Sequence, residues 1–117
     1  MLSHIVLFTP RADIAHGDRQ RLTDALSRAL SAIPSIRRCR IGRRVTYGFS
    51  YEQRMRDDYD YAAILDFDDA DGLKEYLEHP AHEELSRQFY ATVETNLVYD
   101  YELLEGTDGI ADLLGGS

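Results

Sequence analysis

The segment around Pro80 carries the side chains best suited to acid–base chemistry. His79 directly precedes Pro80, which disfavours the α conformation at His79 and predicts a helix-capping or hinge role for it. His82 then falls in the first turn of the helix that begins at Pro80, where the helix dipole disfavours an imidazolium and favours the neutral base. Tyr76 shares an apolar stripe with Leu77, so its ring is predicted to face a sheet while its hydroxyl seeks a partner.

A second ionisable ring stands in the first predicted strand. His4 alternates with Val6 and Phe8, and these three side chains therefore share one face of that strand. If helices cover this face, His4 is at least partly buried and needs a hydrogen-bond partner. A satisfied core histidine is the simplest interpretation from the residues alone. His16, in the sequence Ala15-His16-Gly17, is interpreted as a solvated loop residue.

Other kinds of site lack support. His79 and His82 are three residues apart and Glu83 follows, but the intervening proline points the two rings apart and no further histidine or cysteine is near, so no metal is predicted. The sequence has no Gly-rich phosphate loop, no nucleophile elbow and no Walker lysine. The arginines between 37 and 44 fall on both faces of a strand and are interpreted as solvated, and Cys39 has no paired base in sequence.

Hydrophobic periodicity predicts the elements that position these residues. Period-2 patterns predict strands at 3–9, 36–47, 59–67 and 96–104, and period-3.6 patterns predict helices at 18–33, around 73–77 and at 80–93. Residues 48–58 are predicted to form a polar loop. The order is β-α-β-β-α-β with the second helix broken at Pro80. This order predicts an α+β, ferredoxin-like fold with a four-stranded antiparallel sheet and the helices on one face.

Length and composition set the remaining bounds. The 117 residues, of 13.4 kDa, suffice for one domain, predicted at 1–104, followed by a loose Gly-rich tail at 105–117 in which Ile110, Leu113 and Leu114 could dock as one helical turn. A net charge of −8 argues against nucleic-acid binding. No membrane span or signal peptide is expected, so the predicted location is the cytoplasm. The uncovered sheet face predicts a homodimer.

These features together resemble the stress-responsive A/B barrel (Dabb) family over about residues 2–104. The resemblance rests on His4 in the first strand, the helix closed by Ile33-Pro34, the strand that leads through Phe67 into a short helix, and the pattern Tyr76…His79-Pro80-Ala81-His82. It implies a dimeric α/β barrel in which two sheets face each other. Each subunit of such a barrel can hold a pocket between its sheet and its helices.

The resemblance also implies candidate site residues. Most of the family has no established activity, but it includes plant stress proteins and a plant polyketide cyclase, olivetolic acid cyclase, which closes a ring by an aldol reaction without a cofactor. Matching positions assign catalytic roles to His4, Tyr76 and His82, with no cofactor. The implied ligand-binding wall is mostly aliphatic, unlike that of the cyclase, and consists of Val6, Phe8, Leu22, Leu26, Tyr61, Ala63, Leu65, Leu73, Leu77, Leu85 and Val93.

Three functions follow from this resemblance. The family's record favours a protein of undetermined activity that binds a small apolar or aromatic molecule. One alternative is a cofactor-free cyclase or lyase in which His82 is the general base, Tyr76 stabilises the enolate and His4 orients the carbonyl. Another is a non-catalytic, stress-related dimer. A heme-degrading or quinol-oxidising monooxygenase is disfavoured, because the chain contains no tryptophan and carries the Dabb-type histidine pattern.

Overall fold

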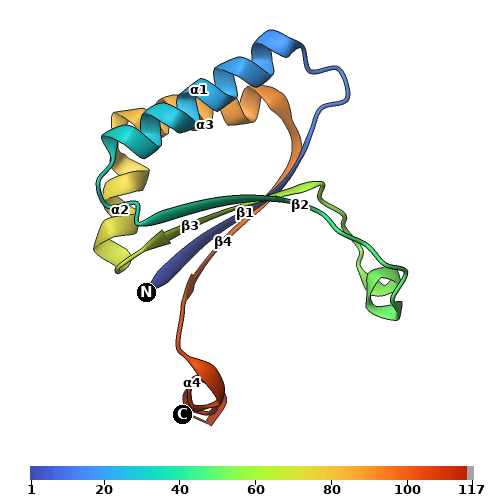
Figure 1. The fold of residues 1–117 in the computed structure, drawn as a ribbon, viewed down its shortest axis with the longest axis vertical. Coiled ribbons are helices and arrows are strands. Elements are labelled where there is room, and N and C mark those ends of the chain that lie inside the picture. The colour runs from blue at the N-terminus through green and yellow to red at the C-terminus, as the bar shows by residue number, and fades with distance from the viewer. Residues whose placement is uncertain (116–117) are drawn as a thin grey trace.

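The computed structural model describes residues 1–115 and confirms the predicted ferredoxin-like architecture (Figure 1). The elements in chain order are β1 (Leu2–Pro10), α1 (His16–Ala32), β2 (Arg38–Arg43), the 3-10 helix η1 (Ser50–Arg54), β3 (Tyr61–Phe67), α2 (Ala70–Glu78), α3 (Pro80–Thr92), β4 (Val93–Glu102) and α4 (Gly106–Gly115). The four strands form one antiparallel sheet in the order β2-β3-β1-β4.

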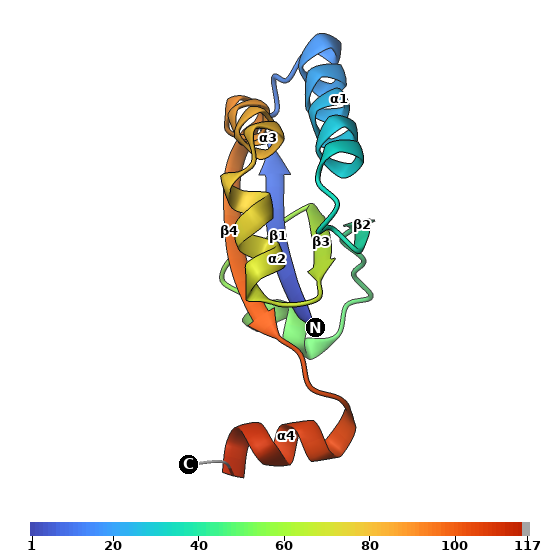
Figure 2. The ribbon, with the colours of Figure 1, turned by 90° about the vertical axis from the view of Figure 1, so that its left-hand side faces the viewer.

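The sheet has two faces of different character. α1 and α3 lie side by side over one face, which we call the pocket face, and no helix within residues 1–115 covers the other, which we call the outer face (Figures 1 and 2). The register places His4 opposite Leu65 and Asp100, so all three lie on the pocket face. The apolar members of the outer face are Ile5, Leu7, Ala62, Ile64, Leu97, Tyr99 and Tyr101.

The buried core lies between the pocket face and the helices, at the end where α2 joins. It is formed by Ala29, Ile33, Leu65, Phe67, Leu73 and Tyr76. The break between α2 and α3 is built as the sequence predicts: His79 has extended backbone, its Nδ1 accepts a hydrogen bond from the backbone N–H of Ala81 at 3.0 Å, and Pro80 is the first helical residue. The capping role of His79 is therefore confirmed.

Several predicted boundaries are wrong, each for a local reason. β2 covers residues 38–43 rather than 36–47, because its partner β3 begins only at Tyr61, which pairs with Arg43. The predicted loop 48–58 contains η1, where the Glu52 carboxylate accepts hydrogen bonds from the N–H groups of Tyr47 and Phe49. β4 begins at residue 93 rather than 96, because it continues its pairing with β1 to the end of that strand.

The start of α1 and the C-terminal tail also differ from the prediction. α1 begins at His16 rather than at residue 18, because the Asp18 carboxylate accepts a hydrogen bond from the N–H of Ala15 at 3.2 Å, and His16 is thus the first helical residue instead of a loop residue. The predicted loose tail forms the helix α4 over residues 106–115, and the last two residues of that tail lie outside the described part. No helix within residues 1–115 is both long and apolar enough to cross a membrane.

Candidate functional site

A cavity of about 540 Å³ lies between the pocket face and the helices. This volume falls within the range of small-molecule sites. The predicted residues among its walls are His4, Val6, Phe8, Leu22, Leu26, Ala63, Leu65, Tyr76, Leu77, His82 and Leu85. The walls also include six residues that were not predicted from the sequence: Thr23, Ile41, Ser86, Phe89, Tyr90 and Val98. Strand alternation and helical spacing contained the signal for most of these, since Ser86 and Phe89 lie four and seven residues after His82.

Three of the predicted wall residues do not line this cavity. Leu73 is buried in the core beneath α2, and Val93 is buried at the start of β4. Tyr61 stands at the far end of β3, where its ring packs against that of Phe8 with 5.7 Å between centroids, and it borders a separate hollow on the outer face. Whether a side chain lines the cavity depends on how far along its strand or helix it stands. A repeating pattern of residues indicates the face of an element but not this position.

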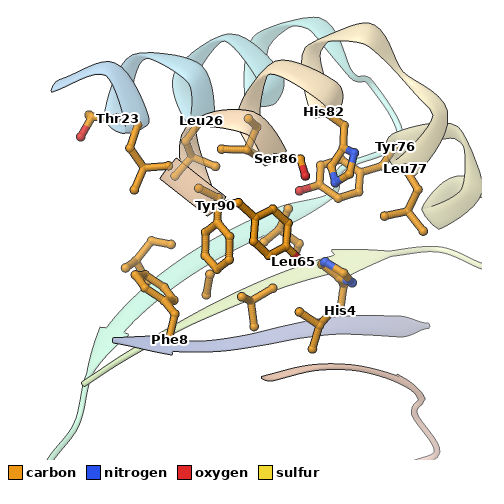
Figure 3. A pocket seen from close by; sticks show the side chains of 17 residues that line it. His4, Phe8, Thr23, Leu26, Leu65, Tyr76, Leu77, His82, Ser86 and Tyr90 are labelled. Carbon is orange, nitrogen blue, oxygen red and sulfur yellow. The ribbon is translucent and has the colours of Figure 1, made fainter. Parts of the chain in front are cut away.

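The polar side chains gather at one end of the cavity. Figure 3 shows His4 rising from the sheet while Tyr76 and His82 approach from the helices, with Phe8 and Thr23 at the opposite end. The Tyr76 ring lies between the two imidazoles, with centroid distances of 5.7 Å to His4 and 4.6 Å to His82, both edge-on. The structure thus brings the three predicted site residues together although they come from β1, α2 and α3.

His4 is held by a partner that the sequence analysis did not identify. Its side chain is buried, and its Nδ1 lies 2.5 Å from Oδ1 of Asp100, the residue directly opposite on β4. An ionised carboxylate only accepts hydrogen bonds, so Nδ1–H is the donor. The other ring nitrogen, Nε2, is then the atom available to a bound molecule. Strand alternation could have placed Asp100 on the pocket face, but only the register sets it opposite His4.

His82 is held in its neutral form. Burial, followed by the electrostatic interaction with the His4 ring, lowers the pKa of His82 below its ordinary value of 6.5, and the hydrogen bond with the Leu77 backbone acts in the opposite direction. The sequence predicted a neutral base from the helix dipole. The pKa of His82 is shifted in the predicted direction. The larger causes, however, are desolvation and the neighbouring His4 imidazole, which only the tertiary structure reveals.

Tyr76 is held as a neutral phenol. It is 3% exposed, and burial, followed by the proximity of Cys39, raises its pKa far above the ordinary value. A phenol in this state donates a hydrogen bond and does not ionise near neutral pH. The polar end of the cavity therefore combines a neutral imidazole at His82, a phenol donor at Tyr76 and a carboxylate-paired imidazole at His4.

The described part of the chain, residues 1–115, contains no cluster of three or more His, Cys, Asp or Glu side chains that could hold a metal ion. The cavity outside its polar end is apolar, with the ring of Phe8 packed edge-on against Phe89 at 5.4 Å. The site can therefore exchange protons with a molecule whose remaining surface is hydrocarbon or aromatic. The cavity has both of its imidazoles and the Tyr76 phenol at one end.

An antiparallel sheet with helices on one face and a cavity between the two layers defines a ferredoxin-like α+β protein with an internal cavity. The chain belongs to the Dabb family: the model of the stress responsive A/B barrel domain matches residues 2–103. No curated protein sequence gives a match.

Solved structures share the fold. A Dabb protein from Mesorhizobium loti is 24% identical, with a TM-score of 0.68 over 89% of this chain and 97% of that one. A dimeric ferredoxin-like protein of unknown function from Thermobifida fusca is 24% identical, with a TM-score of 0.66 over 87% and 90%. The hydroxynitrile lyase of Passiflora edulis is 14% identical, with a TM-score of 0.74 over 90% and 94%.

Proposed function

We propose that this Dabb protein binds a small, largely apolar or aromatic carbonyl compound in the cavity and removes a proton from the carbon beside the carbonyl, without a cofactor. The observation that carries this proposal is the convergence of Tyr76 and two imidazoles at one end of an otherwise apolar cavity. Because both imidazoles and the Tyr76 phenol lie at that end, the carbonyl of a bound molecule is placed among these three side chains.

Each side chain has a role that fits its state. His82, neutral because its pKa is lowered, is the general base. Tyr76, a neutral phenol, donates a hydrogen bond to the oxygen on which enolate charge develops. When the His4 ring is protonated, its Nε2–H donates a hydrogen bond to the carbonyl oxygen, while Asp100 accepts from Nδ1–H and fixes the direction of the ring. Asp100 is a positioning residue, since it acts through His4.

The resulting enolate has more than one possible fate. Attack on a second carbonyl of the same molecule would give the aldol ring closure of a polyketide cyclase, and the largely aliphatic wall suits an alkyl-bearing substrate. Departure of a group from the β carbon with its bonding electrons, while the enolate electron pair forms a C=C bond between the α and β carbons, would give the elimination of a lyase. Removal of the α-proton by His82 is common to both reactions, so it is the step to test first.

We also propose that two copies pair through their outer faces. This face carries apolar side chains that no helix covers, and Tyr99 and Tyr101 are half exposed on it. Ferredoxin-like relatives of this fold are described as dimeric. A second sheet stacked on this face would bury those side chains and complete the barrel.

The proton transfer can be tested without knowledge of the natural substrate. 4-Phenyl-2-butanone in D₂O serves as a probe, and proton NMR follows the loss of its α-proton signals. We expect the wild-type protein to accelerate exchange over buffer. His82→Ala should lower the rate by about 100-fold, as loss of a general base does, and Tyr76→Phe by about 10-fold or more. His16→Ala is the matched control, because His16 is exposed and does not line the cavity.

Two results would overturn the catalytic proposal. Exchange that is equally fast in wild type and His82→Ala would show that this imidazole is not the base. Saturable shifts of the His82 ring signals with the probe, without any exchange above buffer, would instead identify a non-catalytic binding protein.

A further inference from the structure

α4 projects from the body of the subunit in a defined direction. The chain leaves β4 through Leu103 and Leu104 and turns at Gly106, whose φ of +60° suits glycine. Gly109 packs directly on Leu104: a Cβ on this glycine would lie 2.8 Å from that of Leu104. The contact requires glycine and sets the direction of the helix, which lies apart from the layers of the domain (Figure 2).

The subunit does not cover the apolar side of this helix. Ile110, Leu113 and Leu114 follow the i, i+3, i+4 spacing of one stripe, which we call the α4 stripe, and are 57%, 65% and 81% exposed. A helix of ten residues is too short to be stable in water through its own hydrogen bonds. Packing of the α4 stripe on another surface is therefore needed to hold this helix.

A hollow of about 450 Å³ lies on the outer face, at the end of the sheet opposite to the end from which α4 projects. Its apolar floor includes Leu7, Ala62 and Leu97 from three strands, and Met55 from the segment after η1 forms part of its wall. An apolar hollow of this size can accept a few aliphatic side chains. The α4 stripe presents three such side chains.

The charges of the two surfaces are opposite. Three arginines, Arg43, Arg44 and Arg56, border the hollow together with one acid, Asp57. The segment 105–115 carries Glu105, Asp108 and Asp112 and no basic residue. Arg44 pairs with Asp58, whereas within residues 1–115 no acidic side chain forms an ion pair with Arg43 or Arg56. The hollow therefore attracts an acidic helix.

Geometry prevents α4 from reaching its own hollow. α4 and the η1 segment both project to the side of the sheet that faces away from α1 and α3, but from different ends of the sheet (Figure 1). The subunit is correspondingly extended, with a radius of gyration of 16.2 Å, against about 13 Å for a compact domain of this length. If two copies stack their outer faces about a two-fold axis with their strands reversed, the end of each sheet that carries α4 meets the end of the other sheet that carries the hollow.

We propose that α4 is an exchanged arm, whose stripe docks in the hollow of a second copy of this chain. The inference rests on the homodimer proposed above and adds a separate contact to it. The match to the family ends at residue 103, before α4 begins. The arm is therefore a feature of this chain beyond the shared domain, and it locks the direction in which the two sheets stack.

Sedimentation equilibrium measures the dissociation constant of the dimer and tests the arm directly. We expect Leu113→Asp, and a chain that ends at Glu105, to raise the dissociation constant at least tenfold while circular dichroism shows the domain still folded. Ala111→Asp is the control, because it places the same charge on α4 outside the stripe. A wild-type monomer would overturn the homodimer and the arm together, and a dimer that both variants leave unchanged would overturn the arm alone.

Charge exchange tests the identity of the docking surface. Arg43→Glu with Arg56→Glu should weaken the dimer at least tenfold, and the further substitutions Asp108→Arg and Asp112→Arg should restore most of the loss. Weakening that the second pair does not restore would show that α4 docks elsewhere. Arg28→Glu on α1, which is exposed and faces away from both surfaces, is the control for a general charge effect.

Discussion

The two faces of the sheet are made by alternate residues of the same strands, yet they serve different purposes. On the pocket face, Phe67 and Leu65 are 0% and 2% exposed because α1 and α2 cover them. On the outer face, Tyr99 and Tyr101 are 53% and 50% exposed because the subunit provides no cover. One face completes its packing within the chain, and the other is suited to packing against a second copy.

Each face also contains buried polar side chains, and their hydrogen-bonding groups are satisfied differently. On the outer face, the Asp66 carboxylate accepts hydrogen bonds from Ser3 at 2.6 Å and from Arg40 at 3.0 Å, so both of its oxygens are engaged. On the pocket face, His4 bonds Asp100 through one nitrogen only, and the other remains available. A fully hydrogen-bonded network stabilises structure, whereas a ring nitrogen that has no protein partner and faces a cavity can bind or act on a bound molecule.

The largest expected effect comes from the pocket face. Phe67 is fully buried and packs against Tyr76 with ring centroids 5.4 Å apart, so Phe67→Ala leaves a cavity. We expect the free energy of unfolding, measured with urea, to fall by about 3–5 kcal/mol. Phe49→Ala, in the exposed segment before η1, should cost less than about 1 kcal/mol. Equal losses for the two variants would contradict this account of the core.

The outer face should respond through assembly instead of folding. Tyr99→Glu places a charge at the centre of the proposed interface and should raise the dimer dissociation constant about 100-fold, equivalent to about 2.7 kcal/mol. The monomer should keep its circular dichroism spectrum. Tyr90→Glu is the control, since Tyr90 is comparably exposed but lies on α3 at the cavity. If both glutamates weakened the dimer equally, the interface would not be the outer face.

The smallest effect is a pH dependence from the pocket face. The pKa of His82 is lowered below 6.5 in the folded chain, so the unfolded chain takes up a proton first as the pH falls. Stability from this group is complete above pH 6.5 and declines as the pH falls toward the folded pKa. Because a single proton is taken up, the decline stays below about 1.4 kcal/mol per pH unit, and solvent screening of the partly exposed His82 reduces it further.

Urea unfolding at pH 7.5 and pH 5.5 measures that decline. His82→Gln should lose less stability than wild type over this interval, because it removes the titrating group. His16→Gln, at an exposed position, should follow wild type. A slope that His82→Gln leaves unchanged would show that its pKa is not lowered in the folded protein.

The sequence by itself determined the features that depend on neighbouring residues. Alternation along β1 and β3 predicted the two faces, and Pro80 with His79 predicted the helix break and its cap, because caps and periodicity are local properties. The family pattern also predicted that His4, Tyr76 and His82 belong to one site. The tail was misread because its glycines, which are usually interpreted as loop residues, include the close contact of Gly109 with Leu104.

Only the tertiary structure decided how distant elements meet. Asp100 lies 96 residues from His4 in sequence and pairs with it because the register of β1 and β4 sets them opposite each other. Tyr61 was predicted in the cavity wall and lies beyond it, because the twist and length of the strands determine how far the helices extend over the sheet. Register and helix placement are properties of the whole packed domain, and for that reason no local pattern contained them.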